Sequence, residues 1–153
     1  METLKKLEKE SIDFLQGEKL PFIPSGLSSI SSHNIDKGLS FNFSKMELYS
    51  SELQKNPITN KAFGGRIINS EIIRKGKKMY NASFLDFIFA NPEIFPKKMY
   101  EKYIFFAGTI YLDPYGNECV RCLYFDEIGI PSHNYFWLDF PFSENYYFLI
   151  EKE

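Results

Sequence analysis

The stretch that decides the fold is residues 103–126, YIFFAGTIYLDPYGNECVRCLYFD. It contains two runs rich in β-branched and aromatic residues, which favour strands, on either side of the five residues DPYGN at 113–117. In this connection Pro114 presets φ for a turn, and Gly116 supplies the left-handed residue of a type I turn followed by a bulge. The sequence therefore predicts a β-hairpin at the centre of the fold.

The turn also sets the register of the two strands. With Asp113 opposite Asn117, we expect Ile110 to face Val120, Gly108 to face Cys122 and Phe106 to face Tyr124. Alternation then gives a core face of Ile104, Phe106, Ile110, Leu112, Val120, Cys122 and Tyr124. The second face carries Phe105, Ala107, Thr109, Tyr111, Cys119, Arg121, Leu123 and Phe125. This second face is too apolar for an ordinary solvent-exposed sheet surface.

Two further aromatic runs, 135–140 and 145–150, predict that the sheet continues as an antiparallel meander of three to four strands. Helices are expected earlier in the chain. Residues 2–16 have an apolar face of Leu and Phe, and 81–90 is an apolar helix capped by Asn81 or Ser83.

Between these helices, Ser44 and Glu47 match a capping box for a helix that continues to about residue 54. Residues 66–74 fit either two short strands or a short helix capped by Asn69 or Ser70, and 20–43 is irregular with room for a strand at 39–43. We therefore expect one α+β domain over residues 1–153. Its helices would lie mainly in the N-terminal two-thirds and pack on the C-terminal meander.

The composition excludes several classes of protein. At 44% hydrophobic and 18% aromatic, the chain of 153 residues is too apolar to be disordered. The net charge of -2 gives no general affinity for nucleic acid or acidic membranes. No run approaches the ~18 apolar residues of a membrane helix, and the N-terminus has no apolar signal-peptide core. We expect a cytoplasmic protein.

Residues 81–139 resemble a family of small uncharacterised bacterial proteins. The resemblance is carried by NASFLDFIFANPEIFP followed by YIFFAGTIYLDPYGNECVRCLYFD. In that family a short Asn-capped helix and a Pro-Glu-x-x-Pro turn precede a Gly-Thr-Ile-Tyr strand and a hairpin. Here Ala107 and Tyr124 stand where that family would have larger residues or tryptophan. The resemblance implies a shared fold, and because the family has no known function it implies no site residues.

Cys119 and Cys122 have the CxxC spacing of redox and zinc sites. A redox pair needs its first thiol at a helix N-terminus, and a structural zinc ion needs two further ligands. Inside a strand, residues three apart point to opposite faces and cannot act together. We therefore interpret both as structural cysteines and expect neither a metal nor a cofactor.

A catalytic site is the second alternative to the binding function described below. His133 lies in the expected loop 126–134, where Asp126, Glu127 and Asp139 would be near enough to form a general acid–base cluster. The P-loop, GxSxG, HExxH and GxGxxG patterns are absent from the sequence. An enzyme would therefore be an unrecognised one, centred on residues 126–139.

The second face of the hairpin suggests a binding function. Phe105, Tyr111 and Phe125 around Arg121 have the chemistry of a protein–protein hot spot, unless helices simply cover them. The leading prediction is a small cytosolic, non-catalytic binding or regulatory protein with a protein partner, such as an immunity or inhibitor protein.

Nucleic-acid binding is the first alternative. The same aromatic face would stack bases, and the densest basic run of the chain would contact phosphates. The residues of that run are Arg74, Lys75, Lys77 and Lys78.

Overall fold

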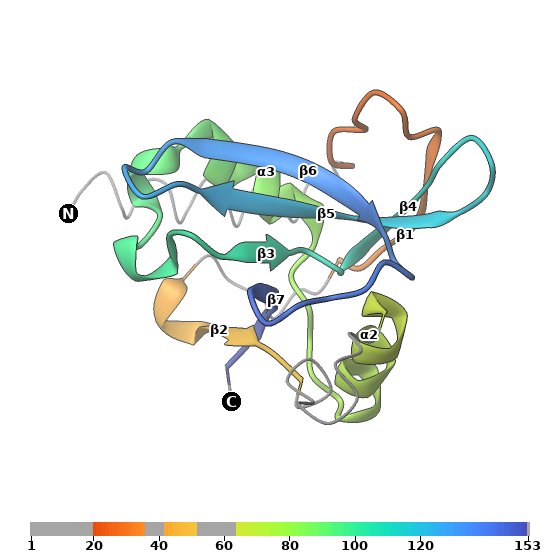
Figure 1. The fold of residues 1–153 in the computed structure, drawn as a ribbon, viewed down its shortest axis with the longest axis horizontal. Helices are drawn as coiled ribbons and strands as arrows, with labels where there is room; N and C mark the ends of the chain where they lie inside the picture. Colours follow the sequence, from red (N-terminus) through yellow and green to blue (C-terminus); the bar gives the residue numbers. More distant parts are fainter. Residues whose placement is uncertain (1–19, 36–41, 52–63, 153) are drawn as a thin grey trace.

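The computed structural model describes residues 20–35, 42–51 and 64–152, and the strands among them form one curled sheet, a half-barrel (Figure 1). Its strands are β1 (Ser29–His33), β2 (Met46–Tyr49), β3 (Tyr103–Phe105), β4 (Thr109–Leu112), β5 (Glu118–Phe125), β6 (Pro131–Trp137) and β7 (Tyr146–Glu151). Two short helices, α2 (Gly65–Arg74) and α3 (Ala82–Ala90), lie in the middle of the chain. Single 3-10 turns are η1 (Phe43–Lys45), η3 (Pro92–Ile94) and η4 (Lys97–Met99). Neither described helix is long and apolar enough to cross a membrane.

The predicted fold class is wrong. The strand order is β1-β4-β5-β3-β7-β2, with β6 on the other edge of β5, so the sheet is not a C-terminal meander. β7 pairs in parallel with β3 and antiparallel with β2, and β1 and β2 come from the first third of the chain. The helix expected over residues 2–16 and most of the strand expected at 39–43 lie outside the described residues.

The helix expected from Ser44 is replaced by η1 and β2. Asn42, rather than Ser44, caps the 3-10 turn, because its Oδ1 accepts the backbone N–H of Ser44 at 3.0 Å. Strand β2 follows at once and pairs with β7 along its whole length, from Met46 opposite Glu151 to Tyr49 opposite Phe148. Pairing with a strand a hundred residues away therefore overrides a local helix signal.

The helix interpretation of 66–74 is the right one, although the helix starts at Gly65 and neither Asn69 nor Ser70 caps it. The helix expected at 81–90 is confirmed. Asn81 Oδ1 accepts the backbone N–H of Ser83, and Asn91 ends the helix.

The hairpin turn is also confirmed. Gly116 has φ +83°, its N–H donates to the carbonyl of Asp113 at 3.0 Å, and Tyr111 pairs with Cys119 in the expected register. Closer to β3 the register differs, because Phe105, not Gly108, faces Cys122. Residues 106–108 leave the ladder between β3 and β4, which shifts β3 by three residues.

The segment that joins α2 to α3 fills the break between β3 and β4. Gly108 N–H donates to the carbonyl of Tyr80 at 3.0 Å, and Tyr80 N–H donates to the carbonyl of Leu149 at 3.1 Å. A Cβ atom on Gly108 would lie 2.7 Å from the carbonyl oxygen of Met79 and 2.8 Å from the backbone nitrogen of Asn81. Backbone therefore passes directly against Gly108, where no side chain fits.

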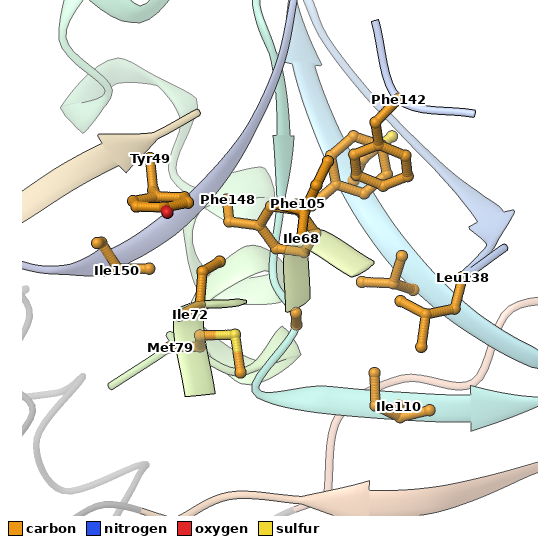
Figure 2. Packing of buried hydrophobic residues seen from close by; sticks show 13 residues of the cluster. Tyr49, Ile68, Ile72, Met79, Phe105, Ile110, Leu138, Phe142, Phe148 and Ile150 are labelled. Carbon is orange, nitrogen blue, oxygen red and sulfur yellow. The ribbon is translucent and has the colours of Figure 1, made fainter. Parts of the chain in front are cut away.

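This passage lets the chain cover both faces of the sheet. We call the face of the sheet that is covered by α2 the α2 face. The buried residues of its core are Tyr49, Ile68, Ile72, Met79, Phe105, Ala107, Ile110, Val120, Cys122, Leu138, Phe142, Phe148 and Ile150 (Figure 2). The α3 face is packed by Met46, Tyr80, Phe84, Leu85, Ile88, Phe95, Met99, Ile104, Phe106, Leu123, Phe125 and Leu149. Phe105 and Phe106 are both fully buried, one on each face. The predicted division into a core face and a second face is therefore replaced by two cores.

We expect Gly108→Ala to destabilise the protein by about 2–3 kcal/mol, because the added methyl group meets backbone atoms that cannot move aside without breaking the bonds to Leu149. Gly116→Ala is the matched control. Its Cβ meets nothing within 4 Å, so only the left-handed conformation of the turn is strained, at about 1 kcal/mol. Urea unfolding of both variants measures the difference, and equal midpoints would contradict the proposed close passage.

Candidate functional site

The four residues predicted to form an exposed aromatic surface are inside the protein. Phe105, Tyr111, Arg121 and Phe125 are each 1% exposed or less. Phe105 packs on the α2 face, whereas Phe125 stacks on Phe95 on the α3 face with ring centroids 4.4 Å apart. Burial, one of the alternatives considered from the sequence, is the arrangement that the structure has. Only Tyr111 and Arg121 come together.

Arg121 forms a buried polar centre with residues from three other parts of the chain. Its Nη1 lies 2.8 Å from Asp86 Oδ1, on α3, and 3.4 Å from the hydroxyl of Tyr111. Its Nη2 lies 3.4 Å from Nδ1 of His133. Its Nε has no hydrogen-bond partner among the described residues. A buried guanidinium is stable only beside such a carboxylate, so Asp86 and Arg121 depend on each other.

The centre holds the N-terminal segment 20–24 by its backbone. Phe22 N–H donates to Asp86 Oδ2 at 2.8 Å, and the Phe22 carbonyl accepts from the Tyr111 hydroxyl at 2.8 Å and from Arg121 Nη1 at 3.3 Å. The guanidinium also lies over the Phe22 ring, with Arg121 Cζ 5.6 Å from the ring centroid. The ion pair thus fastens an extended segment to the sheet, which is a structural role.

His133 lies on strand β6, not in the expected loop, and the predicted acid–base cluster does not assemble around it. Asp126 Oδ1 accepts the backbone N–H groups of Ile128 and Ile130, and Asp139 pairs with Arg66 at 2.7 Å. Burial, and then the neighbouring Arg121, lower the pKa of His133, while Asp86 opposes the shift. The imidazole is therefore held in its neutral form.

The two cysteines are free and buried in different clusters. Burial raises the pKa of Cys119 to about 11 and that of Cys122 to about 12, so both are protonated thiols. Within residues 20–35, 42–51 and 64–152, no three His, Cys, Asp or Glu side chains gather closely enough to hold a metal ion.

The basic run ends α2 and leads into the segment that fills the sheet. Arg74, Lys75 and Lys78 are exposed and Lys77 is half-buried. Lys75 Nζ lies 3.3 Å from Glu71 Oε1 and 3.1 Å from the Tyr49 hydroxyl, so part of the positive charge is neutralised. The aromatic residues expected to stack bases lie in the interior, so they form no such platform beside the basic run.

A groove lined mainly by aromatic rings lies at the tip of the hairpin, and it was not predicted from the sequence. We call it the aromatic groove. It has a volume of about 540 Å³. Its lining residues are Gly26, Asp113, Pro114, Tyr115, Tyr135, Phe136, Trp137 and Phe140. Tyr115 is 90% exposed, Trp137 57% and Phe140 40%, so three large rings meet solvent around one hollow.

Asp113 couples this groove to the hairpin turn. Its Oδ1 accepts the backbone N–H groups of Tyr115 and Asn117, at 2.9 and 2.8 Å, and its Oδ2 accepts the indole N–H of Trp137 at 3.2 Å. Burial alone would raise the pKa of the Asp113 carboxyl, but the hydrogen bonds from Asn117, Tyr115 and Trp137 outweigh burial and lower it. The carboxylate is ionised and fixes the Trp137 ring at the wall of the groove.

Two signals in the sequence pointed to this groove. Tyr115 stands at a turn position that has no need of an apolar ring, and Trp137 is the single tryptophan of the chain. What the sequence lacked was the register that brings β6 beside β5 and places Trp137 opposite Cys119, next to the turn.

Comparison of the chain with models of known protein families, with curated proteins and with solved structures finds no match. The resemblance of residues 81–139 to small bacterial proteins stays a prediction.

We expect Asp86→Ala to destabilise the protein by about 3 kcal/mol, because it leaves the Arg121 guanidinium buried without its carboxylate and frees Phe22. Asp139→Ala, which removes one partner of the exposed Arg66, is the control and should cost much less. The double variant Asp86→Leu/Arg121→Met should recover much of the loss, since it leaves no unpaired charge. Urea unfolding decides, and an Asp86→Ala variant as stable as Asp139→Ala would contradict this account.

The lowered pKa of His133 predicts a loss of stability in mild acid. The unfolded chain takes up a proton near pH 6.5, but the folded protein does so only at lower pH. The stabilising contribution is therefore complete above about pH 6.5 and is lost as the pH falls toward and through the pKa of the folded state. His33, whose pKa burial also lowers, contributes in the same sense.

We expect His133→Gln to remove part of the pH dependence of the urea midpoint between about pH 7.5 and 5. His33→Gln should remove a further part of the same dependence. The double variant should show almost no slope until the carboxylates titrate. A His133→Gln variant with the unchanged slope of the parent protein would show that His133 titrates normally in the folded state.

Proposed function

We propose that this protein is a small, non-catalytic binding protein that acts by contact with another protein, and that the aromatic groove is the contact surface. The observation that carries the proposal is the exposure of Tyr115, Trp137 and Phe140 around one hollow, whereas the other rings of β3 and the β4–β5 hairpin are buried or, at Tyr103 and Tyr124, half-buried. Contiguous exposed apolar surface of this kind is typical of interaction sites.

The chemistry of these side chains suits a protein partner. Tyrosine and tryptophan are the residues most enriched at interface hot spots, because they bury a large apolar area and lose little conformational entropy. Trp137 is already fixed by its bond to Asp113, so binding does not have to order the ring.

The area limits the strength of such a contact. Aromatic side chains bury roughly 150–250 Å² each, so the exposed parts of the three rings total about 350 Å². At about 25 cal/mol per Å², covering them contributes roughly 9 kcal/mol. Association costs about 4–15 kcal/mol, so the groove alone supports weak binding, and tight binding requires further contacts outside it.

We further propose that this binding is regulatory and takes place in the cytoplasm, as in an immunity or inhibitor protein that covers part of its target. Two buried, protonated cysteine thiols suit a reducing compartment. The Arg121 centre has no part in the contact; it is support for the fold.

The proposal predicts that Tyr115→Ala weakens partner binding at least tenfold without unfolding the protein, because this ring is almost wholly outside the fold. Ile128→Ala is the matched control. Its side chain is 74% exposed, on the turn at the opposite end of the β5–β6 hairpin. Proteins captured on the parent protein from cells of the native host would be purified and their affinity for each variant measured by calorimetry.

A purified partner whose affinity falls with Tyr115→Ala and not with Ile128→Ala supports the groove. A partner that binds both variants as tightly as the parent protein would overturn it. Equal thermal stability of the two variants, measured in parallel, excludes unfolding as the cause.

A further inference from the structure

We infer that the occupant of the aromatic groove is a proline-containing segment of the partner in the polyproline II conformation, with a basic residue beside Asp113. The inference rests on the proposed function, since it names the part of the partner that enters the same groove. Three observations carry it: the poorly suited edge of β6, the chemistry of the lining, and the charge around the groove.

The edge of β6 beside the groove is poorly suited to a partner strand. The bonds from Leu138 N–H to Glu118 and from Asp126 N–H to Ile130 show that even-numbered residues of β6 bond toward β5. In an antiparallel ladder bonded pairs alternate, so residues 131, 133, 135 and 137 direct their N–H and C=O groups to the outer edge. Within the described residues β6 has no other strand partner, so this edge is where an added strand would pair.

At three of these four positions one of the two backbone groups is unavailable for such pairing. Pro131 has no N–H, the N–H of Tyr135 is taken by Asn134 Oδ1 at 2.8 Å, and the carbonyl of Trp137 is taken by Phe140 N–H at 2.9 Å. An extended segment in the groove is therefore held through side chains and not by strand addition.

The lining of the groove fits a polyproline II segment. Such a helix has no internal hydrogen bonds, and it docks in grooves lined by aromatic rings. Pro114, Tyr115, Trp137 and Phe140 offer ring surfaces to pyrrolidine rings, and the exposed Tyr115 hydroxyl offers a donor to a free carbonyl. Because proline presets the bound conformation, a segment of this kind also keeps the ordering cost low for a groove of small area.

The charge around the groove selects a basic segment. Asp113 is the one charged side chain among the lining residues, and it is ionised. Nearby, Glu118 and Asp139 share the single guanidinium of Arg66, at 2.8 and 2.7 Å. Together these three carboxylates and one guanidinium of the described residues carry a net charge of -2, which favours lysine or arginine in the ligand.

Trp137 makes the inference directly testable, because it is the only tryptophan in the chain and lies in the wall of the groove. Its fluorescence in the full-length protein would be followed during titration with a peptide of six prolines flanked by arginines. Two control peptides replace the prolines by glycine and serine, or the arginines by glutamates.

We expect a saturable change in emission with the arginine-flanked proline peptide and at least fivefold weaker binding of each control peptide. Tyr115→Ala should weaken binding of the proline peptide at least tenfold, with Ile128→Ala unchanged. Higher salt should reduce the preference for arginine over glutamate flanks, because the attraction is electrostatic.

Equal binding of the glycine-serine peptide would overturn the polyproline assignment, and equal binding of the glutamate-flanked peptide would overturn the basic one. If no peptide binds while a captured partner still requires Tyr115, this inference fails and the proposed function stands. If the captured partner also binds Tyr115→Ala as tightly as the parent protein, the proposed function fails with it.

Discussion

The close approach of Gly108 to the backbone of residues 79–81 is the constraint on which this fold depends. At that point the sheet is open between β3 and β4, and the connection from α2 to α3 passes through the opening, bonded to Gly108 on one side and to Leu149 on the other. Without it, one helix could not reach the α2 face while the next covers the α3 face. Each face of the single sheet is covered by one short helix and its connections. About a hundred described residues therefore make two cores without a second sheet or a long helical layer.

Asp113 plays the corresponding part for the groove. The same carboxylate accepts bonds from the turn backbone and from the Trp137 indole, so the shape of the hairpin and the position of the exposed ring are one arrangement. The middle of β5 is organised differently. There Arg121 and Asp86 are buried and hold the segment around Phe22, and their charges are neutralised inside the protein. One ionised group, Asp113, thus lies buried at the wall of the groove, and the other pair is part of the core.

Local chemistry explains what could be predicted from the sequence. The DPYGN turn and the helix cap at 81–83 are decided within five residues; the turn was predicted correctly, and of the two expected caps, Asn81 and Ser83, the structure has Asn81. The three-residue shift of β3 and the replacement of the expected helix by β2 depend on Leu149 and its neighbours in β7, which are far away in the sequence. The aromatic face failed as a site for the same reason. Whether Phe105 and Arg121 meet solvent depends on helices whose position no local pattern determines.

The frame of the groove determines how it would bind the proposed partner. Its walls are a turn fixed by four hydrogen bonds to Asp113 and a strand paired along its length with β5, so the free and bound shapes are nearly the same. A preformed site of this kind loses little entropy on binding, but it also cannot enlarge its contact by folding around the ligand. Its affinity is therefore limited by the area of the three rings. A ligand that is itself stiff, and whose charge complements Asp113, gains the most from a surface that is small and rigid.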